Sequence, residues 1–241
     1  MQATNPKKVF RAAIKGRLTG RISDYRFASE AQYFLEGFTP TTGDIAIDGG
    51  AYDGATSIAF AKCGAKVFAF EMDVTNFQNC AARLKRFGGD YDITLENMGL
   101  SDTEGTENYN FYGTGSSKNP NGTLTAQFID LDTYVARKNL PRVDYIKLDI
   151  EGAELDMLHG AVQTIKRCKP KMAISVYHQI DDLWTLALYV KSLRPDYEFE
   201  FRHYRIDCTD YMLEDEHRAI LKYFGLSFLI PNHGEMVLYC R

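Results

Sequence analysis

The sequence has no apolar run that approaches the roughly 20 residues needed to cross a bilayer as a helix. Its first residues also lack the apolar core of a secretory signal peptide. These two absences predict a soluble, cytoplasmic protein without a membrane span. The five cysteines are scattered and include no CxxC pair, so they predict reduced thiols rather than a zinc or redox site.

An excess of basic charge is absent as well. The 241 residues include 28 Lys and Arg against 32 Asp and Glu, which gives a formal net charge of −4. Such a chain has no overall positive field that attracts nucleic acid, so we expect no nucleic-acid partner. With 45% hydrophobic and 25% charged residues, the composition is that of a globular protein, and one domain is the default expectation.

A basic segment opens the chain. Residues 1–43 precede the first expected strand, and Phe10, Ile14 and Leu18 recur at a spacing of four. This spacing predicts an N-terminal helical cap over 1–43, followed by one folded domain over 44–241. Basic side chains surround the apolar positions, which fits either a solvated helix face or a surface for an anionic substrate.

From residue 44, short apolar runs alternate with helical patterns, which is typical of a βαβ series and a parallel sheet. The expected strands are 45–48, 67–71, 91–96, 106–112, 125–129, 144–149, 172–177, 197–203 and 236–240. The expected helices are 53–63, 76–87, 131–138, one helix marked by Leu155 to Ile165, and 182–193. Residues 113–123 contain no large apolar side chain and predict a loop, either a flap over a site or a surface insertion.

The stretch IAIDGGAYDG, residues 45–54, is apolar, then acidic, then glycine-rich. Glycines between a strand and a helix let the backbone approach a nucleotide-like ligand. A dinucleotide turn needs GxGxxG for its pyrophosphate, whereas the glycines here are Gly49, Gly50 and Gly54. A carboxylate at Asp48 would repel a diphosphate and attract a cation. The turn therefore favours S-adenosylmethionine, which carries sulfonium and ammonium groups, over NAD.

Two later strand ends predict the rest of an adenosine site. Glu71 ends the second strand, where a carboxylate can accept both ribose hydroxyls of either kind of cofactor. The segment ENMGLSD, residues 96–102, follows the third strand and is placed to border an adenine ring, although an ordinary turn has the same pattern. We expect the adenosine part of the ligand at these two places.

Acidic residues gather at the end of the strand over 144–149. Lys147 and Asp149 share one face of this strand, because side chains alternate along it. Asp149 stands at the carboxyl end, where open α/β sheets bind their ligands. A buried carboxylate is costly without a partner, so Asp149 is the first candidate for the reactive centre. Glu151 and Glu154 follow, and Glu154 fits a capping box at the next helix.

A histidine and two aspartates follow the fifth parallel strand. A neutral imidazole at His178 fits a general base, and Asp181 or Asp182 fits a helix cap. Together with Asp149, these residues offer oxygen and nitrogen ligands that Mg²⁺ or Mn²⁺ accepts. The sequence thus gives a candidate metal site of Asp149, His178, Asp181 and Asp182, with a metal-free reaction as the alternative.

The chain resembles the FkbM-type S-adenosylmethionine-dependent methyltransferases over residues 44–204, through DGGAYDG, Glu71, NMGLSD, LDTY, DYIKLDIEGAELDMLHGA and SVYHQIDDLW in this order. The IKLDIEGAE block and the YH segment with its following acids are the specific parts. The resemblance implies an α/β class I methyltransferase fold. This is a Rossmann-like three-layer sandwich whose mostly parallel seven-stranded sheet has an antiparallel last strand. Tyr52 departs from the wider pattern [DE]-x-G-x-G-x-G, because it replaces the middle glycine.

The resemblance also implies O-methylation of a hydroxyl of a sugar, sugar nucleotide or glycan, with S-adenosyl-L-methionine as cofactor. The Mg²⁺ or Mn²⁺ option depends on the candidate metal ligands alone. The expected partner is a small-molecule or glycan acceptor, and a homo-oligomer stays open. The residues expected to bind the cofactor are Asp48, Gly49, Gly50, Ala51, Tyr52, Gly54, Glu71, Met72, Met98, Gly99, Leu100, Ser101 and Asp149. The expected catalytic residues are Asp149, His178 and Lys147. A non-catalytic adenosine-binding protein and an NAD-dependent oxidoreductase of similar fold are the alternatives.

Overall fold

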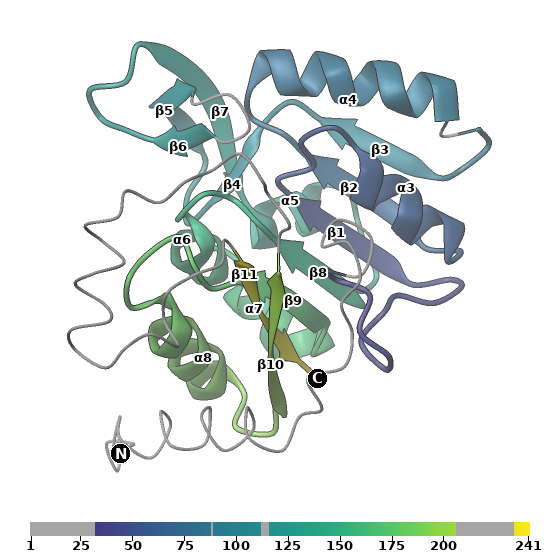
Figure 1. Ribbon diagram of the computed structural model, residues 1–241, viewed down its shortest axis with the longest axis vertical. Coiled ribbons are helices and arrows are strands. Elements are labelled where there is room, and N and C mark those ends of the chain that lie inside the picture. The colour runs from purple at the N-terminus through teal and green to yellow at the C-terminus, as the bar shows by residue number, and fades with distance from the viewer. Residues whose placement is uncertain (1–31, 88, 112–115, 206–233) are drawn as a thin grey trace.

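The computed structural model describes residues 32–87, 89–111, 116–205 and 234–241 (Figure 1). The strands are β1 (Ile45–Gly49), β2 (Lys66–Phe70), β3 (Ile93–Glu96), β4 (Gly99–Ser101), β5 (Gly105–Phe111), β6 (Ser116–Lys118), β7 (Leu124–Asp130), β8 (Tyr145–Leu148), β9 (Lys171–Ser175), β10 (Phe199–Arg205) and β11 (Gly234–Cys240). The helices are α3 (Ala55–Lys62), α4 (Val74–Phe87), α5 (Leu131–Arg137), α6 (Glu154–His159), α7 (Val162–Cys168) and α8 (Asp182–Leu193). Residues 1–31, which hold most of the predicted helical cap, lie outside the described ranges.

The main sheet of the described chain has seven strands in the order β10-β11-β9-β8-β1-β2-β3. In this sheet β11 runs antiparallel to its neighbours β9 and β10, and the other neighbouring pairs are parallel. The predicted class I sheet with an antiparallel last strand is therefore confirmed. Its central strands are short apolar runs because helices cover them on both faces.

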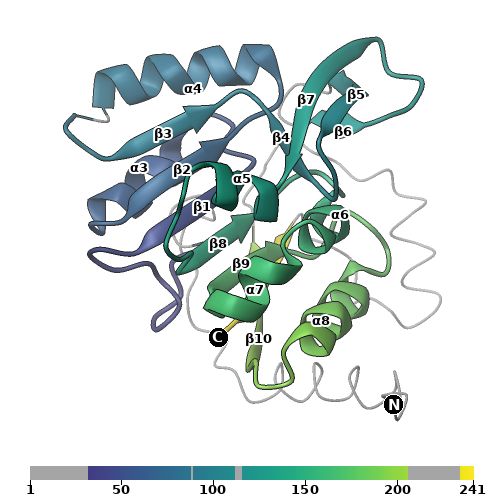
Figure 2. The same cartoon turned by 180° about the vertical axis from the view of Figure 1, so that it is seen from behind.

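Helices on the two faces of the sheet make three layers (Figures 1 and 2). On one face, α5, α6, α7 and α8 share a large apolar core with the sheet, which includes Ile146 and Leu158. On the other face, α3, α4 and residues 32–43 share a second core, which includes Phe60 and Tyr145. No helix among the described residues is both long and apolar enough to cross a bilayer.

A smaller sheet, in the order β4-β7-β5-β6, lies beside the main one, and α6 packs on β4. The predicted loop over 113–123 is wrong for Ser116–Lys118, which form β6 and pair with β5. Strands β4 and β6 have three residues each. A run this short contains too few positions for a period-two pattern to indicate a strand.

Two helix predictions differ from the structure. The single helix expected after β8 is two helices, α6 and α7, with Gly160 at the junction. A Cβ at Gly160 would stand 2.1 Å from the carbonyl oxygen of Ser101, so the chain passes close to β4 at this point. Residues 32–43 are turns rather than the end of a helical cap. Gly37 and Gly43 have φ of +81° and +85° there, which interrupt a helix.

Candidate active site

The backbone N–H groups of the glycine-rich turn after β1 already form hydrogen bonds within the protein. Those of Gly50 and Ala51 donate to the carbonyl oxygen of Phe70, at 3.0 and 2.9 Å. The N–H of Tyr52 donates to Oε2 of Glu71 at 2.9 Å. These donors are therefore not free to bind a diphosphate, in agreement with the missing GxGxxG pattern.

The turn after β1 packs directly against the turn after β8. A Cβ at Gly50 would lie 1.9 Å from the carbonyl oxygen of Asp149. Each turn contains a residue with a left-handed backbone, since Tyr52 has φ of +49° and Glu151 has φ of +56°. Glycine adopts this conformation more easily, which explains why the wider pattern has glycine at the position of Tyr52.

A buried ion pair lies beneath the turn. The pairing of β1 with β8 sets Asp48 opposite Lys147, whose Nζ lies 3.2 Å from Oδ1 of Asp48. The Lys147 ammonium also donates to the carbonyl oxygens of Gly49 and Gly50, at 3.0 and 2.7 Å. Ser57 in α3 donates to the other Asp48 oxygen at 2.5 Å. Asp48 and Lys147 thus hold the turn from behind, and their cofactor and catalytic roles stay predictions.

Glu71 follows β2, and the backbone holds both of its carboxylate oxygens. Oε2 accepts the N–H of Tyr52 and Oε1 accepts the N–H of Asp73, each at 2.9 Å. The side chain is buried, and burial raises the pKa of Glu71 to about 7 against the lowering effect of these hydrogen bonds. Each oxygen keeps a second lone pair. The carboxylate can therefore accept one hydroxyl of a ribose on each oxygen.

The segment over 96–102 runs from the last residue of β3 through β4 and continues the cavity wall. Three of its residues line the cavity: Met98, Gly99 and Leu100. Ser101 is fully buried and donates to Oδ1 of Asp102 at 3.0 Å. The Lys118 ammonium donates to Oγ of Ser101, which joins β4 to β6. Ser101 therefore supports the wall rather than forming its surface.

These segments enclose a cavity of about 490 Å³, within the size range of small-molecule sites. The expected cofactor residues that line it are Gly50, Tyr52, Glu71, Met72, Met98, Gly99, Leu100 and Asp149. The expected cofactor residues that do not line it are Asp48, Gly49, Ala51, Gly54 and Ser101. Ser116 and Lys118 also line it, which places part of the predicted 113–123 loop at the site.

Asp149 directly follows β8 and lines the cavity. The hydroxyl of Tyr33 donates to its Oδ2 at 2.9 Å, and that of Tyr177 donates to its Oδ1 at 3.0 Å. Burial opposes ionisation, but the charges of Lys147 and His178 hold the pKa of Asp149 below its usual value. Asp149 is thus a carboxylate that two tyrosines orient at the cavity wall.

His178 lies among carboxylates and is not one of the cavity-lining residues. Its Nδ1 is 2.9 Å from Oε1 of Glu154, and its Nε2 is 3.5 Å from Asp149 and 3.6 Å from Glu151. Burial opposes protonation, but Glu154 and the other carboxylates raise the pKa of His178 to about 9. Because His178 is not among the residues that line the cavity, its predicted role as general base stays a prediction.

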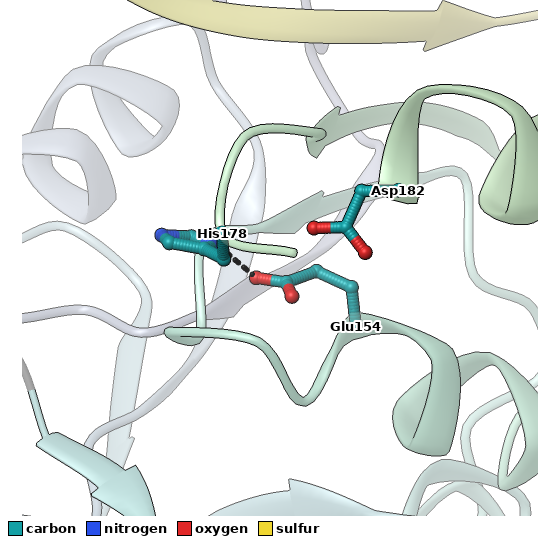
Figure 3. Close-up of side chains that lie close together, drawn as sticks. All are labelled: Glu154, His178 and Asp182. Atoms are coloured by element: carbon teal, nitrogen blue, oxygen red, sulfur yellow. Dashed lines mark ion pairs between the residues drawn. The ribbon is translucent and has the colours of Figure 1, made fainter. Parts of the chain in front are cut away.

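Only some of the predicted metal ligands lie in one cluster of possible ligands. Glu154, His178 and Asp182 have ligand atoms within 4.8 Å of one another (Figure 3). Asp181, which directly precedes α8, is exposed instead and accepts a hydrogen bond from the Thr185 hydroxyl at 3.2 Å. Glu154, expected as a helix-capping residue, therefore belongs to the cluster, and Asp181 does not.

Sequence reasoning missed Tyr33 and Tyr177 as site residues. Tyr33 contacts Asp149 across 116 positions of sequence, which no local pattern indicates. Its backbone N–H donates to the Tyr239 hydroxyl at 3.0 Å, and the Tyr145 hydroxyl donates to its carbonyl oxygen at 2.9 Å. Tyr177 precedes His178 in the segment after β9, which the sequence already placed at the site. Its position next to a predicted site residue was the signal that could have identified it.

The chain matches the family model of the methyltransferase FkbM domain over residues 48–229. Among solved structures, it is similar to a methyltransferase FkbM from Methylobacillus flagellatus KT, with 29% sequence identity and a TM-score of 0.60. That match covers 74% of this chain and 44% of the relative, so this chain spans less than half of the relative's length. Precorrin-6y C5,15-methyltransferase from Geobacter metallireducens GS-15 has a similar fold, at 13% identity, a TM-score of 0.50, and coverage of 83% and 81%. No curated protein matches the sequence significantly.

The family match covers well over half of the chain and includes the β1 turn, Glu71, Asp149 and His178. The sheet order, with β11 antiparallel, agrees with it. The alternative of an NAD-dependent oxidoreductase is thereby set aside, in line with the turn's paired N–H groups. The chain belongs to the FkbM family of S-adenosylmethionine-dependent methyltransferases.

Proposed function

We propose that this methyltransferase transfers the methyl group of S-adenosylmethionine to a hydroxyl of a sugar, sugar nucleotide or glycan. The observation that carries the proposal is the position of Asp149. Its carboxylate lines the same cavity as Glu71 and the β1 turn, and two tyrosine hydroxyls orient it. A hydroxyl is a poor nucleophile near neutral pH, so it needs a group that takes its proton.

The cavity supports one orientation of the cofactor. Glu71 would accept the ribose hydroxyls, and the residues 98–100 would border the adenine ring. The methionine part would then lie toward Gly50 and Asp149, where the two turns meet. This orientation brings the sulfonium methyl group toward the end of the cavity that Asp149 lines.

The reaction is an in-line displacement at a methyl carbon that positive sulfur already activates. The acceptor oxygen forms a bond to the methyl carbon while the carbon–sulfur bond breaks, and the sulfonium becomes the neutral thioether of S-adenosylhomocysteine. The hydroxyl proton passes to the Asp149 carboxylate. Much of the rate then depends on alignment of the acceptor, which the protein provides by binding it. Tyr33 and Tyr177 act as positioning residues, because they hold the carboxylate.

The test is methyl transfer from radiolabelled S-adenosylmethionine to a panel of sugar nucleotides and oligosaccharides. The methylated product should be stable to mild base, as an ether is, whereas a methyl ester would hydrolyse. We expect Asp149→Asn to lower turnover by about 10²- to 10⁴-fold, the usual contribution of a general base. Far-UV circular dichroism reports whether the variant is folded.

Asp181→Asn is the matched control, because Asp181 is an exposed aspartate outside the cavity. It should keep the wild-type turnover. Turnover of Asp149→Asn equal to wild type would remove Asp149 from the mechanism. A base-labile or nitrogen-linked methyl product would overturn hydroxyl methylation, and cofactor binding without any transfer would favour the non-catalytic alternative.

A further inference from the structure

Three side chains from separate segments meet behind the cavity wall. Glu154 begins α6, His178 lies in the segment after β9, and Asp182 begins α8. They are 1%, 8% and 6% exposed, respectively. Figure 3 shows the Glu154 carboxylate pointing toward the His178 ring, with the Asp182 carboxylate close to Glu154. The arrangement does not depend on the methyl-transfer proposal.

One carboxylate oxygen of this cluster has no hydrogen-bond partner among the described residues. Oε1 of Glu154 accepts the N–H of Ile150 at 2.9 Å, whereas its buried Oε2 accepts no hydrogen bond. Asp182 receives the N–H of Gln179 on Oδ2 at 2.7 Å. A buried carboxylate oxygen without a donor is costly, and native proteins rarely leave one unsatisfied. The free oxygen of Glu154 therefore indicates a missing partner.

Negative charge exceeds positive charge around His178. Carboxylates of Asp149, Glu151 and Glu154 lie within 3.6 Å of its ring nitrogens. Among the described residues, no Lys or Arg forms an ion pair with Glu154 or Asp182. Buried charges are stable only when they are paired or coordinate a metal. One imidazole is a small counter-charge for this set of acids.

We propose that Glu154, His178 and Asp182 bind a divalent metal ion of the Mn²⁺ or Zn²⁺ type. One imidazole nitrogen and two carboxylate oxygens are the mixed ligand set that these borderline ions accept, whereas Ca²⁺ prefers oxygen ligands alone. The separation of 2.9 Å between Nδ1 of His178 and Oε1 of Glu154 is close to that of two ligands at right angles around one octahedral ion at about 2.1 Å from each, a geometry that suits Mn²⁺ better than tetrahedral Zn²⁺. The metal joins the segments after β8 and β9.

The test uses protein that has been stripped with a chelator and then titrated with Mn²⁺. Electron paramagnetic resonance measures the loss of the free Mn²⁺ signal, and pulsed measurements detect nitrogen from a bound imidazole. We expect one bound Mn²⁺ for each chain with coupling to one imidazole. Glu154→Gln, His178→Gln and Asp182→Asn should each weaken binding by more than about tenfold. Asp181→Asn and His159→Gln are the matched controls and should bind as the wild type does.

Three measurements keep the outcome clear when a variant folds poorly. Far-UV circular dichroism and S-adenosylhomocysteine binding identify folded variants. Nitrogen-15 labelling of histidine in the wild type should change the observed coupling without any substitution. The proposal is overturned by three outcomes: no bound Mn²⁺ or Zn²⁺ at millimolar metal, bound Mn²⁺ without nitrogen coupling, or equal affinity in all folded cluster variants. None of these outcomes bears on methyl transfer, which is measured separately.

Discussion

We expect Glu71 to make cofactor binding depend on pH. Its pKa of about 7 results first from burial and then from the nearby Asp73, against two backbone hydrogen bonds and the charge of Lys147. Ribose hydroxyls that donate to its oxygens would favour the ionised form. Cofactor binding below pH 7 should therefore release a proton, because Glu71 is largely protonated there in the free protein.

The affinity for S-adenosylhomocysteine should rise about tenfold between pH 6 and pH 8, since the ionised fraction of a group with a pKa of about 7 rises by this factor. Calorimetric titration at the two pH values measures it. Glu71→Gln should bind more weakly and with a flat pH profile. If the variant kept the slope of the wild type, the dependence would belong to another group.

The same carboxyl group should affect the stability of the ligand-free protein. Its folded pKa of about 7 lies above the ordinary value of 4.5, so folding favours the protonated form. The stabilisation is fully present below pH 4.5 and is lost as the pH rises through 7. Urea unfolding of wild type and Glu71→Gln at pH 5 and 7.5 isolates this contribution. The wild type should lose more stability than the variant over this range, and an equal loss in both would argue against it.

The junction of α6 and α7 lies directly against β4. A Cβ at Gly160 would lie 2.1 Å from the carbonyl oxygen of Ser101 and 2.8 Å from Cβ of Asp130. Gly160→Ala should therefore lower the free energy of unfolding by about 1–3 kcal/mol, as overpacking usually does. Because β4 carries Gly99 and Leu100 at the cavity wall, cofactor affinity should also fall. Urea denaturation and calorimetry measure the two effects.

Gly105→Ala is the control for this substitution. No atom lies within 4 Å of a Cβ at Gly105, so alanine there should change stability by no more than about 1 kcal/mol. Equal losses in the two variants would show that the effect comes from the glycine backbone and not from contact with β4.

The elements that the sequence predicts well are those that a local hydrophobic or glycine pattern defines. The strand before Asp48 and the glycine turn are contiguous, and the apolar run before Asp149 has the length of a buried strand. Strands β4 and β6 are too short to show a period, and the break at Gly160 depends on contact with β4. Tyr33 reaches Asp149 only through the tertiary fold, so its role becomes visible only with the structure.

At the scale of the whole molecule, the cavity joins the two sheets and residues far apart in sequence, from Gln32 to Tyr177. A ligand that fills it should stabilise the fold as a unit. At a concentration of S-adenosylhomocysteine 100 times its Kd, the expected stabilisation is about 2.7 kcal/mol. For a domain of this size, this corresponds to a rise in Tm of about 5–10 °C.

Differential scanning calorimetry over a series of ligand concentrations tests this expectation. Glu71→Ala should need much more ligand for the same rise in Tm, whereas Asp181→Asn should follow the wild type. No rise in Tm at saturating ligand would mean that the cavity is not the cofactor site.

The position of β11 has a consequence for the synthesis of the protein. β11 lies between β9 and β10, although the ribosome makes it after both. While the chain is growing, the edge of β9 is therefore without its partner strand. Tyr239, whose hydroxyl accepts the N–H of Tyr33, has not yet been synthesised at this stage. An unpaired apolar strand edge readily pairs with other chains. The nascent chain is thus most exposed to aggregation just before β11 leaves the ribosome, which makes this the stage where a chaperone would help it most.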